Sequence, residues 1–125
     1  MRLIEEELTE QIISAAIEVH RAQGPGLLES AYEECFCHEL DLRRLRFARQ
    51  IILPVKYKNI ALDIGYRIDV IVEDKVIVEL KAVQTVLPVH EAQLLTYMKL
   101  KQIRVGLLLN FHEPALKDGI VRRVL

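Results

Sequence analysis

The stretch Tyr66-Arg-Ile-Asp-Val-Ile-Val-Glu-Asp-Lys-Val-Ile-Val-Glu-Leu-Lys81 has the residue alternation of a β-hairpin. Apolar residues occupy the even-numbered positions of both halves, and side chains on a strand alternate between its two faces. A three-residue loop at Glu73-Asp74-Lys75 would set Asp69 opposite Glu79, whereas a two-residue turn would place these carboxylates on different faces. We therefore expect Asp69, Glu79 and Lys81 to meet on the face opposite the even-numbered residues.

This charged cluster has two interpretations. On a solvated strand face, opposite charges stabilise a strand pair slightly, and the pattern taken alone favours this interpretation. In a functional site, two neighbouring carboxylates would repel each other unless a cation lay between them, and such hard oxygen ligands suit Mg²⁺ or Mn²⁺. A lysine beside them would then activate a water or stabilise a developing anion. The remaining sequence decides between the two.

Composition limits the class of protein. A chain of 125 residues that is 51% hydrophobic is expected to form one globular domain, residues 1–125, around a single core. Seventeen Lys and Arg against eighteen Asp and Glu give a net charge of −1, so any site for a polyanion must be local. The sequence shows neither an apolar run of membrane-spanning length nor a signal peptide, and Cys35 and Cys37 are not spaced for a disulfide or a zinc site. We expect a cytoplasmic protein without membrane contact.

The order of predicted elements indicates an α/β fold with a mixed sheet. Helical periodicity covers residues 4–22 and 27–45, and the apolar stripe of the second helix is expected at Leu28, Ala31, Cys35 and Leu42. A strand is expected over residues 50–58, in which Pro54 suggests a sheet edge or a bulge, with a turn at 58–59 before the central hairpin. A helix should begin at Pro88 and run to residue 101, followed by a doubly buried strand at 104–110 and a short strand within 117–125. This order predicts three antiparallel strands plus one parallel strand, flanked by helices.

Polar residues on two of the predicted helices add to the hairpin cluster. Glu29 and Tyr32 share one helix face, and His90, Gln93 and Tyr97 share a face of the later helix. Each has an ordinary structural explanation: Glu29 in a first turn suits the helix dipole, a lone histidine is commonly a surface residue, and a tyrosine packs with a polar tip. These structural explanations account less well for two polar stripes that occur together on helices beside the core.

These residues resemble the GxxExxY proteins, a group assigned to the PD-(D/E)XK nuclease superfamily. The resemblance rests on Gly26-x-x-Glu29-x-x-Tyr32, Asp69 with Glu79-x-Lys81, His90-Glu-Ala-Gln93 with Tyr97 after it, and Gly106-Leu-Leu-Leu-Asn-Phe111. It covers nearly the whole chain, and the helix, three strands, helix, strand order agrees with the core of that superfamily. The proline that leads the motif is absent, since Ile68 precedes Asp69, and this proline is often missing in the superfamily.

The resemblance implies a divalent metal site. By position in the motifs, Asp69 and Glu79 would bind Mg²⁺ or Mn²⁺, the carbonyl of Leu80 would be a further ligand, and Glu29 would complete the site. Lys81 would position or deprotonate the attacking water and offset charge in the transition state.

The resemblance also implies a second group of residues and a reaction. Gln93 and Tyr97 would orient Lys81 or a substrate phosphate, with His90 joining them. The implied activity is hydrolysis of phosphodiester bonds in DNA or RNA. Because the domain is small, we expect a homodimer or a protein partner to help it hold a long substrate. Proteins with this fold can lose catalytic activity, so the alternative is a non-catalytic binding or regulatory module with the nuclease fold. A third possibility is a hydrolase that acts on some other phosphoester.

Overall fold

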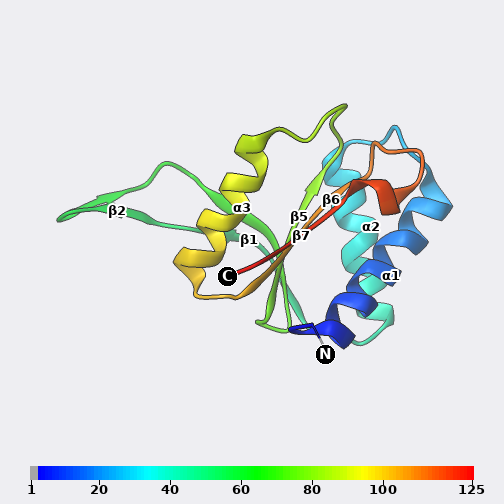
Figure 1. Ribbon diagram of the computed structural model, residues 1–125, viewed down its shortest axis with the longest axis horizontal. Coiled ribbons are helices and arrows are strands. Elements are labelled where there is room, and N and C mark those ends of the chain that lie inside the picture. The colour runs from blue at the N-terminus through cyan, green and yellow to red at the C-terminus, as the bar shows by residue number, and fades with distance from the viewer. Residues whose placement is uncertain (1–2) are drawn as a thin grey trace.

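A five-stranded mixed sheet lies at the centre of the protein, in a computed structural model that describes residues 3–125 (Figure 1). The elements in chain order are α1 (Glu6–Gln23), α2 (Glu29–Leu42), β1 (Phe47–Ile52), β2 (Val55–Tyr57), β3 (Ile60–Leu62), β4 (Arg67–Val72), β5 (Val76–Lys81), α3 (Pro88–Lys101), β6 (Val105–Asn110), the 3₁₀ helix η1 (Leu116–Gly119) and β7 (Ile120–Val124). The strand order is β1-β4-β5-β6-β7, and only β5 and β6 are parallel. The predicted fold class is confirmed, with β7 as the expected additional short strand.

Helices cover both faces of this sheet. Figure 1 shows α1 and α2 on one side and α3 on the other. Because a parallel pair needs a long crossover, α3 connects β5 to β6 and comes to lie on the face away from α1 and α2. All residues of β6 are buried, as the unbroken apolar run predicted. Gly106 on this strand allows close approach of α3, since a Cβ there would lie 2.6 Å from Met98 Sδ and 2.9 Å from Leu94 Cδ1.

The β4–β5 hairpin has the predicted turn, but its ladder ends before the predicted pair of Asp69 and Glu79. Val72 pairs with Val76 around a turn at residues 73–75, and the ladder continues to the pair formed by Val70 and Val78. The even-numbered strand residues from Val70 to Leu80 pack towards α1 and α2, while Ile71 and Ile77 pack in the cluster under α3. The face expected to carry the charged cluster is therefore covered by a helix. Ile68 also packs under α3, so the expectation that all even-numbered residues share one face is wrong there. The alternation breaks at Asp69, which the β1–β4 ladder omits beside the positive φ of Gln50.

The segment 50–58 was predicted as one strand, and this is wrong. The strand β1 ends at Ile52, and β2 begins only after Pro54, which lacks the N–H that a continuous ladder needs. β2 pairs with β3, a strand the sequence pattern did not predict, through the expected turn at Lys58-Asn59. Figure 1 shows this β2–β3 hairpin extending away from the main sheet.

The buried stripe of α2 also differs from the prediction. Leu28 and Leu42 are exposed, and the helix buries Tyr32, Phe36 and Leu40 instead. The prediction chose among several apolar residues by period alone, whereas the packing of α2 on α1 and β5 selects the aromatic face. Within residues 3–125, no helix combines the length and apolar character needed to cross a membrane.

Candidate active site

Asp69 and Glu79 are joined by reciprocal hydrogen bonds at the point where the β4–β5 ladder ends. The backbone N–H of Asp69 donates to Oε2 of Glu79 at 2.8 Å, and the backbone N–H of Leu80 donates to Oδ2 of Asp69 at 2.9 Å. Side-chain carboxylates thus accept the hydrogen bonds that strand carbonyls would otherwise accept. The two acids are held between adjacent strands rather than extending freely into solvent.

Burial rules out a solvated strand face for this pair. Glu79 is 5% exposed and Asp69 is half-buried. Burial and then the neighbouring Asp69 charge raise the pKa of Glu79 well above its ordinary value. Burial likewise raises the pKa of Asp69, against the lowering effect of its hydrogen bond from Leu80. Two close, buried acids therefore destabilise each other when both are charged, and a cation would relieve that repulsion.

Lys81 and Glu29 complete the arrangement expected from the sequence. Lys81 is half-buried at the end of β5, and its positive charge lowers the pKa of both Asp69 and Glu79. Its backbone is fixed because its carbonyl accepts the N–H of Phe111 at 2.8 Å. Glu29, the first residue of α2, accepts the N–H of Ala82 through Oε2 at 3.3 Å, and its charge contributes to the raised pKa of Asp69. The structure therefore brings these four side chains to one end of the sheet.

Glu33 is a further acid that the sequence analysis missed. It is 7% exposed, one helical turn beyond Glu29, and its charge raises the pKa of Asp69 and of Glu79. Arg49 donates to its Oε2 through Nη2 at 2.8 Å and Nε at 3.1 Å, and Gln50 donates to its Oε1 at 2.7 Å. The spacing of four from Glu29 was the available signal, because residues i and i+4 share a helix face.

A cavity of about 630 Å³ lies between Asp69 and the acids of α2. Its walls include Glu29, Glu33, Arg49, Asp69 and Leu80, so α2, β1, β4 and β5 all contribute. Its charged groups are mostly acidic, with the Arg49 guanidinium paired to Glu33 and to Glu34. Such an acidic wall suits a cation, or a substrate phosphate whose charge is neutralised by a bound cation. It would repel an anion without one.

Gln93 and Tyr97 lie on α3, on the other side of the carboxylates. Tyr97 is buried, and burial followed by the charges of Glu79 and Asp69 raises its pKa to about 12. Its hydroxyl is therefore in the electrostatic field of the acid pair. Gln93, one turn earlier, is half-buried. Together with Tyr97 it lines a groove along α3.

His90 and Tyr32 have clear structural roles. Nδ1 of His90 accepts the N–H of Leu87 at 3.0 Å, which caps the start of α3 and leaves Nε2 for any substrate contact. Tyr32 is fully buried, stacks on Phe111 with ring centroids 4.5 Å apart, and donates its hydroxyl to the carbonyl of Gly24. The tyrosine of the Gly26-x-x-Glu29-x-x-Tyr32 stretch thus fixes the loop that leads into the first residue of α2.

The donor set suits a hard divalent cation held by few protein ligands. Across residues 3–125, no three side chains of His, Cys, Asp or Glu are arranged closely enough to enclose a metal ion. Asp69 and Glu79 each use one carboxylate oxygen in the hydrogen bonds above, which leaves Oδ1 and Oε1 for coordination. Mg²⁺ commonly binds through one or two carboxylates and keeps several waters, so the residues present fit it.

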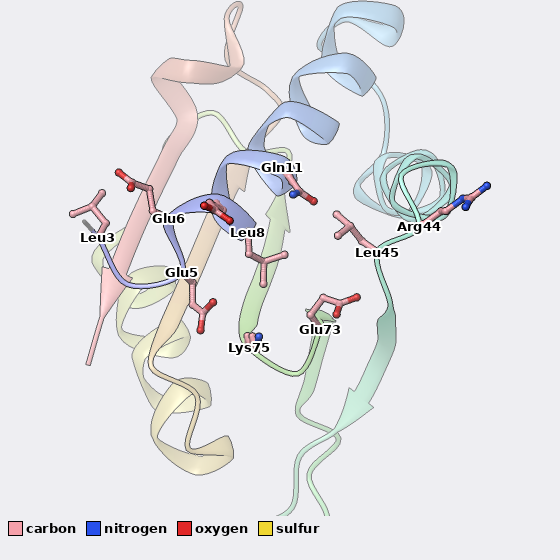
Figure 2. A pocket seen from close by; sticks show the side chains of 10 residues that line it. Leu3, Glu5, Glu6, Leu8, Gln11, Arg44, Leu45, Glu73 and Lys75 are labelled. Atoms are coloured by element: carbon pink, nitrogen blue, oxygen red, sulfur yellow. The ribbon is translucent and has the colours of Figure 1, made fainter. Parts of the chain in front are cut away.

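A second cavity, of about 540 Å³, lies beside the β4–β5 turn and the start of α1 (Figure 2). Its charged lining is dominated by glutamates, including Glu5 and Glu73, with Lys75 and Arg44 as the cations. It lies at the turn end of the hairpin, whereas Glu79 and Lys81 lie towards the opposite end of β5. The two cavities therefore belong to different parts of the molecule.

A comparison with models of protein families agrees with this geometry. The family model described as the PD-(D/E)XK nuclease superfamily matches residues 6–124. Neither a search of curated proteins nor a search of solved structures found a match. The matched range includes every element from α1 to β7 and all the side chains brought together at the end of β5. The chain belongs to the PD-(D/E)XK nuclease superfamily.

Proposed function

We propose that this protein is a nuclease of the GxxExxY type that hydrolyses phosphodiester bonds with Mg²⁺ or Mn²⁺. The observation that carries the proposal is the hydrogen-bonded pair of buried Glu79 and half-buried Asp69, in which burial and then the charge of Asp69 raise the pKa of Glu79. A structural role alone does not account for two close acids that destabilise each other when charged. Because the chain belongs to a nuclease superfamily, binding of a metal ion for phosphodiester hydrolysis would account for this arrangement.

The carboxylates of Asp69 and Glu79 would hold the cation through the oxygens not used in their reciprocal hydrogen bonds. Leu80 borders the same cavity as Asp69, so its carbonyl would supply a further ligand. Glu29 would complete the site through a metal-bound water, because no three carboxylates within residues 3–125 are close enough to share one ion. When bound, the metal would polarise a phosphate oxygen and lower the pKa of a bound water. Glu33 would influence the acid pair through its charge while remaining paired with Arg49.

Lys81 would position the attacking water and offset the negative charge that develops on the phosphate. Its fixed backbone supports this role, because precise placement of a charged donor is what lowers the barrier. Tyr97 and Gln93 would orient a substrate phosphate from the α3 side, and His90 would contribute through Nε2. DNA or RNA is the proposed substrate.

A cleavage assay tests this proposal. Labelled single-stranded and double-stranded DNA and RNA should be cut with Mg²⁺ or Mn²⁺ and left intact in EDTA. Calcium should bind and support little turnover, because its looser coordination positions a water poorly. Asp69→Asn should lose metal binding and cleavage together. A wild-type protein that neither cleaves nor is stabilised by these metals would instead be a non-catalytic module with the nuclease fold.

A further inference from the structure

A groove lies beside the acid pair, between α3 and the segment that carries the β2–β3 hairpin. Its volume is about 350 Å³, towards the lower end of small-molecule sites, which span ~300–1,000 Å³. Its walls are largely apolar and aromatic and include Leu53, Tyr66, Val89, Gln93 and Tyr97. A flat apolar group therefore fits it better than a charged one.

The groove approaches the candidate active site at Tyr97. This side chain lines the groove and packs in the same apolar cluster as Ile68, the residue before Asp69. A chain molecule with one phosphate at the carboxylates would therefore carry its neighbouring group over the groove.

The charge of the adjoining segment favours an anionic occupant. Residues 52–67, which include the β2–β3 hairpin, contain Lys56, Lys58 and Arg67 against the single acid Asp63, although the whole chain has a net charge of −1. The cavity in Figure 2 has the opposite character, because glutamates dominate its charged lining. The hairpin segment beside the groove thus attracts a polyanion, whereas the cavity in Figure 2 repels one.

Exposed aromatic rings extend the groove along the hairpin. Tyr57 is 62% exposed, and Nζ of Lys58 lies 5.3 Å from the centroid of its ring. Because side chains alternate along a strand, Tyr57 shares a face of β2 with Val55, which lines the groove. Tyr66, at the groove itself, is 40% exposed. Aromatic rings combined with cations are the usual platform for the bases and backbone of single-stranded nucleic acid.

The geometry points to a binding site for an unpaired base in this groove, with the strand continuing over Tyr57 on the β2–β3 hairpin. This inference rests on the proposed nuclease function and narrows its substrate to single-stranded nucleic acid or to single-stranded ends. The bases of an intact duplex are paired and stacked inside the helix, so they are not available to such a groove.

Binding without cleavage tests the inference. Fluorescence anisotropy in EDTA would compare labelled oligothymidine, labelled oligouridine and a labelled duplex of equal length. The wild type should bind at least one single strand about tenfold more tightly than the duplex. The preferred oligonucleotide then distinguishes DNA from RNA, and equal or tighter binding of the duplex would overturn the inference.

Two groove variants and one control locate the site. Tyr66→Ala removes an aromatic wall, and Ala92→Phe fills the groove from an exposed position of α3, so it does not disturb the core. Each should weaken single-strand binding about tenfold while thermal denaturation remains cooperative. Leu42→Ala, which truncates an exposed side chain at the end of α2, should bind as the wild type does. Groove variants that bind single strands with wild-type affinity would overturn the inference. It would also be overturned if size-exclusion chromatography showed that the variants only dissociate a dimer.

The two proposals fail in different ways. If the wild type binds single strands through the groove but cleaves nothing with Mn²⁺, the groove stands and the nuclease proposal fails. If the wild type cleaves with Mn²⁺, and Tyr66→Ala and Ala92→Phe cleave single strands and duplexes at the wild-type rates, the groove inference fails and the nuclease proposal stands.

Discussion

The carboxylate of Glu79 accepts the backbone N–H of Asp69, so the two acids of the site are tied to each other's strands. This contact fixes their separation in the fold, and the metal-free protein must bear the repulsion between them. Hydrogen bonding and electrostatics therefore act in opposite directions at this position.

Glu79→Gln should stabilise the metal-free protein near neutral pH. The folded-state pKa of Glu79 is raised above its ordinary value of 4.5, so the folded protein retains a proton that the unfolded chain releases. The stability associated with this proton is fully present below about pH 4.5 and is lost as pH rises into the neutral range. In EDTA we expect the variant to gain on the order of 1–2 kcal/mol at about pH 8 and little at about pH 5.

Thermal denaturation at the two pH values measures this difference. Glu10→Gln, on the exposed surface of α1, is the matched control and should show no comparable pH-dependent gain. A Glu79→Gln variant that is less stable than wild type at both pH values would contradict the assignment of repulsion at this pair.

Mn²⁺ should raise the thermal stability of the wild type but not that of Asp69→Asn. A ligand that binds only the folded state stabilises it by about 2.7 kcal/mol at a hundredfold excess over its Kd. Binding requires charged Asp69 and Glu79, whose pKa values are raised, so the stabilisation should grow as pH rises towards neutrality. Differential scanning fluorimetry with increasing Mn²⁺ checks both effects, and equal shifts in the two proteins would remove Asp69 from the metal site.

Lys81→Met should retain metal binding and lose most of the cleavage rate. The methionine preserves the apolar part of the side chain and removes the charge, so the Mn²⁺-induced shift in Tm should persist while kcat falls by roughly 100-fold or more. Comparing kcat with KM separates lost transition-state stabilisation from lost substrate binding. Lys75→Met, in the exposed β4–β5 turn, is the control and should cleave as the wild type does.

Arg49→Met should destabilise the fold, and adding Glu33→Gln should restore part of the loss. Arg49 donates two hydrogen bonds to the buried carboxylate of Glu33, and its removal would leave that charge unpaired. About a third of the Arg49 side chain is exposed, so we expect a loss on the order of 2–3 kcal/mol, somewhat below that for a fully buried pair. Urea denaturation of both single variants and the double variant measures the coupling, and additive losses would show that the pair acts independently.

Several features were predictable because they depend on neighbours in the chain. Alternation with period two and a three-residue turn predicted the pairing of Val72 with Val76, since strand geometry and loop length set the facing residues. The break in alternation at Asp69 was not predictable in this way. Pro88 marked the start of α3, and an unbroken apolar run marked β6 as buried on both faces. The assignment to the PD-(D/E)XK superfamily is confirmed, while the GxxExxY assignment and the roles of the site residues remain predictions.

Contacts between distant segments needed the tertiary structure. Glu33 meets Arg49 and Gln50 only because α2 packs beside β1, and its spacing from Glu29 does not indicate which side of the helix will be buried. The β2–β3 hairpin separated from β1 because Pro54 interrupts the ladder, and this placed Tyr66 beside α3 to form a groove. Local geometry thus determined which side chains share a strand or helix face, whereas packing between elements decided which of those faces became buried and which came together in a site.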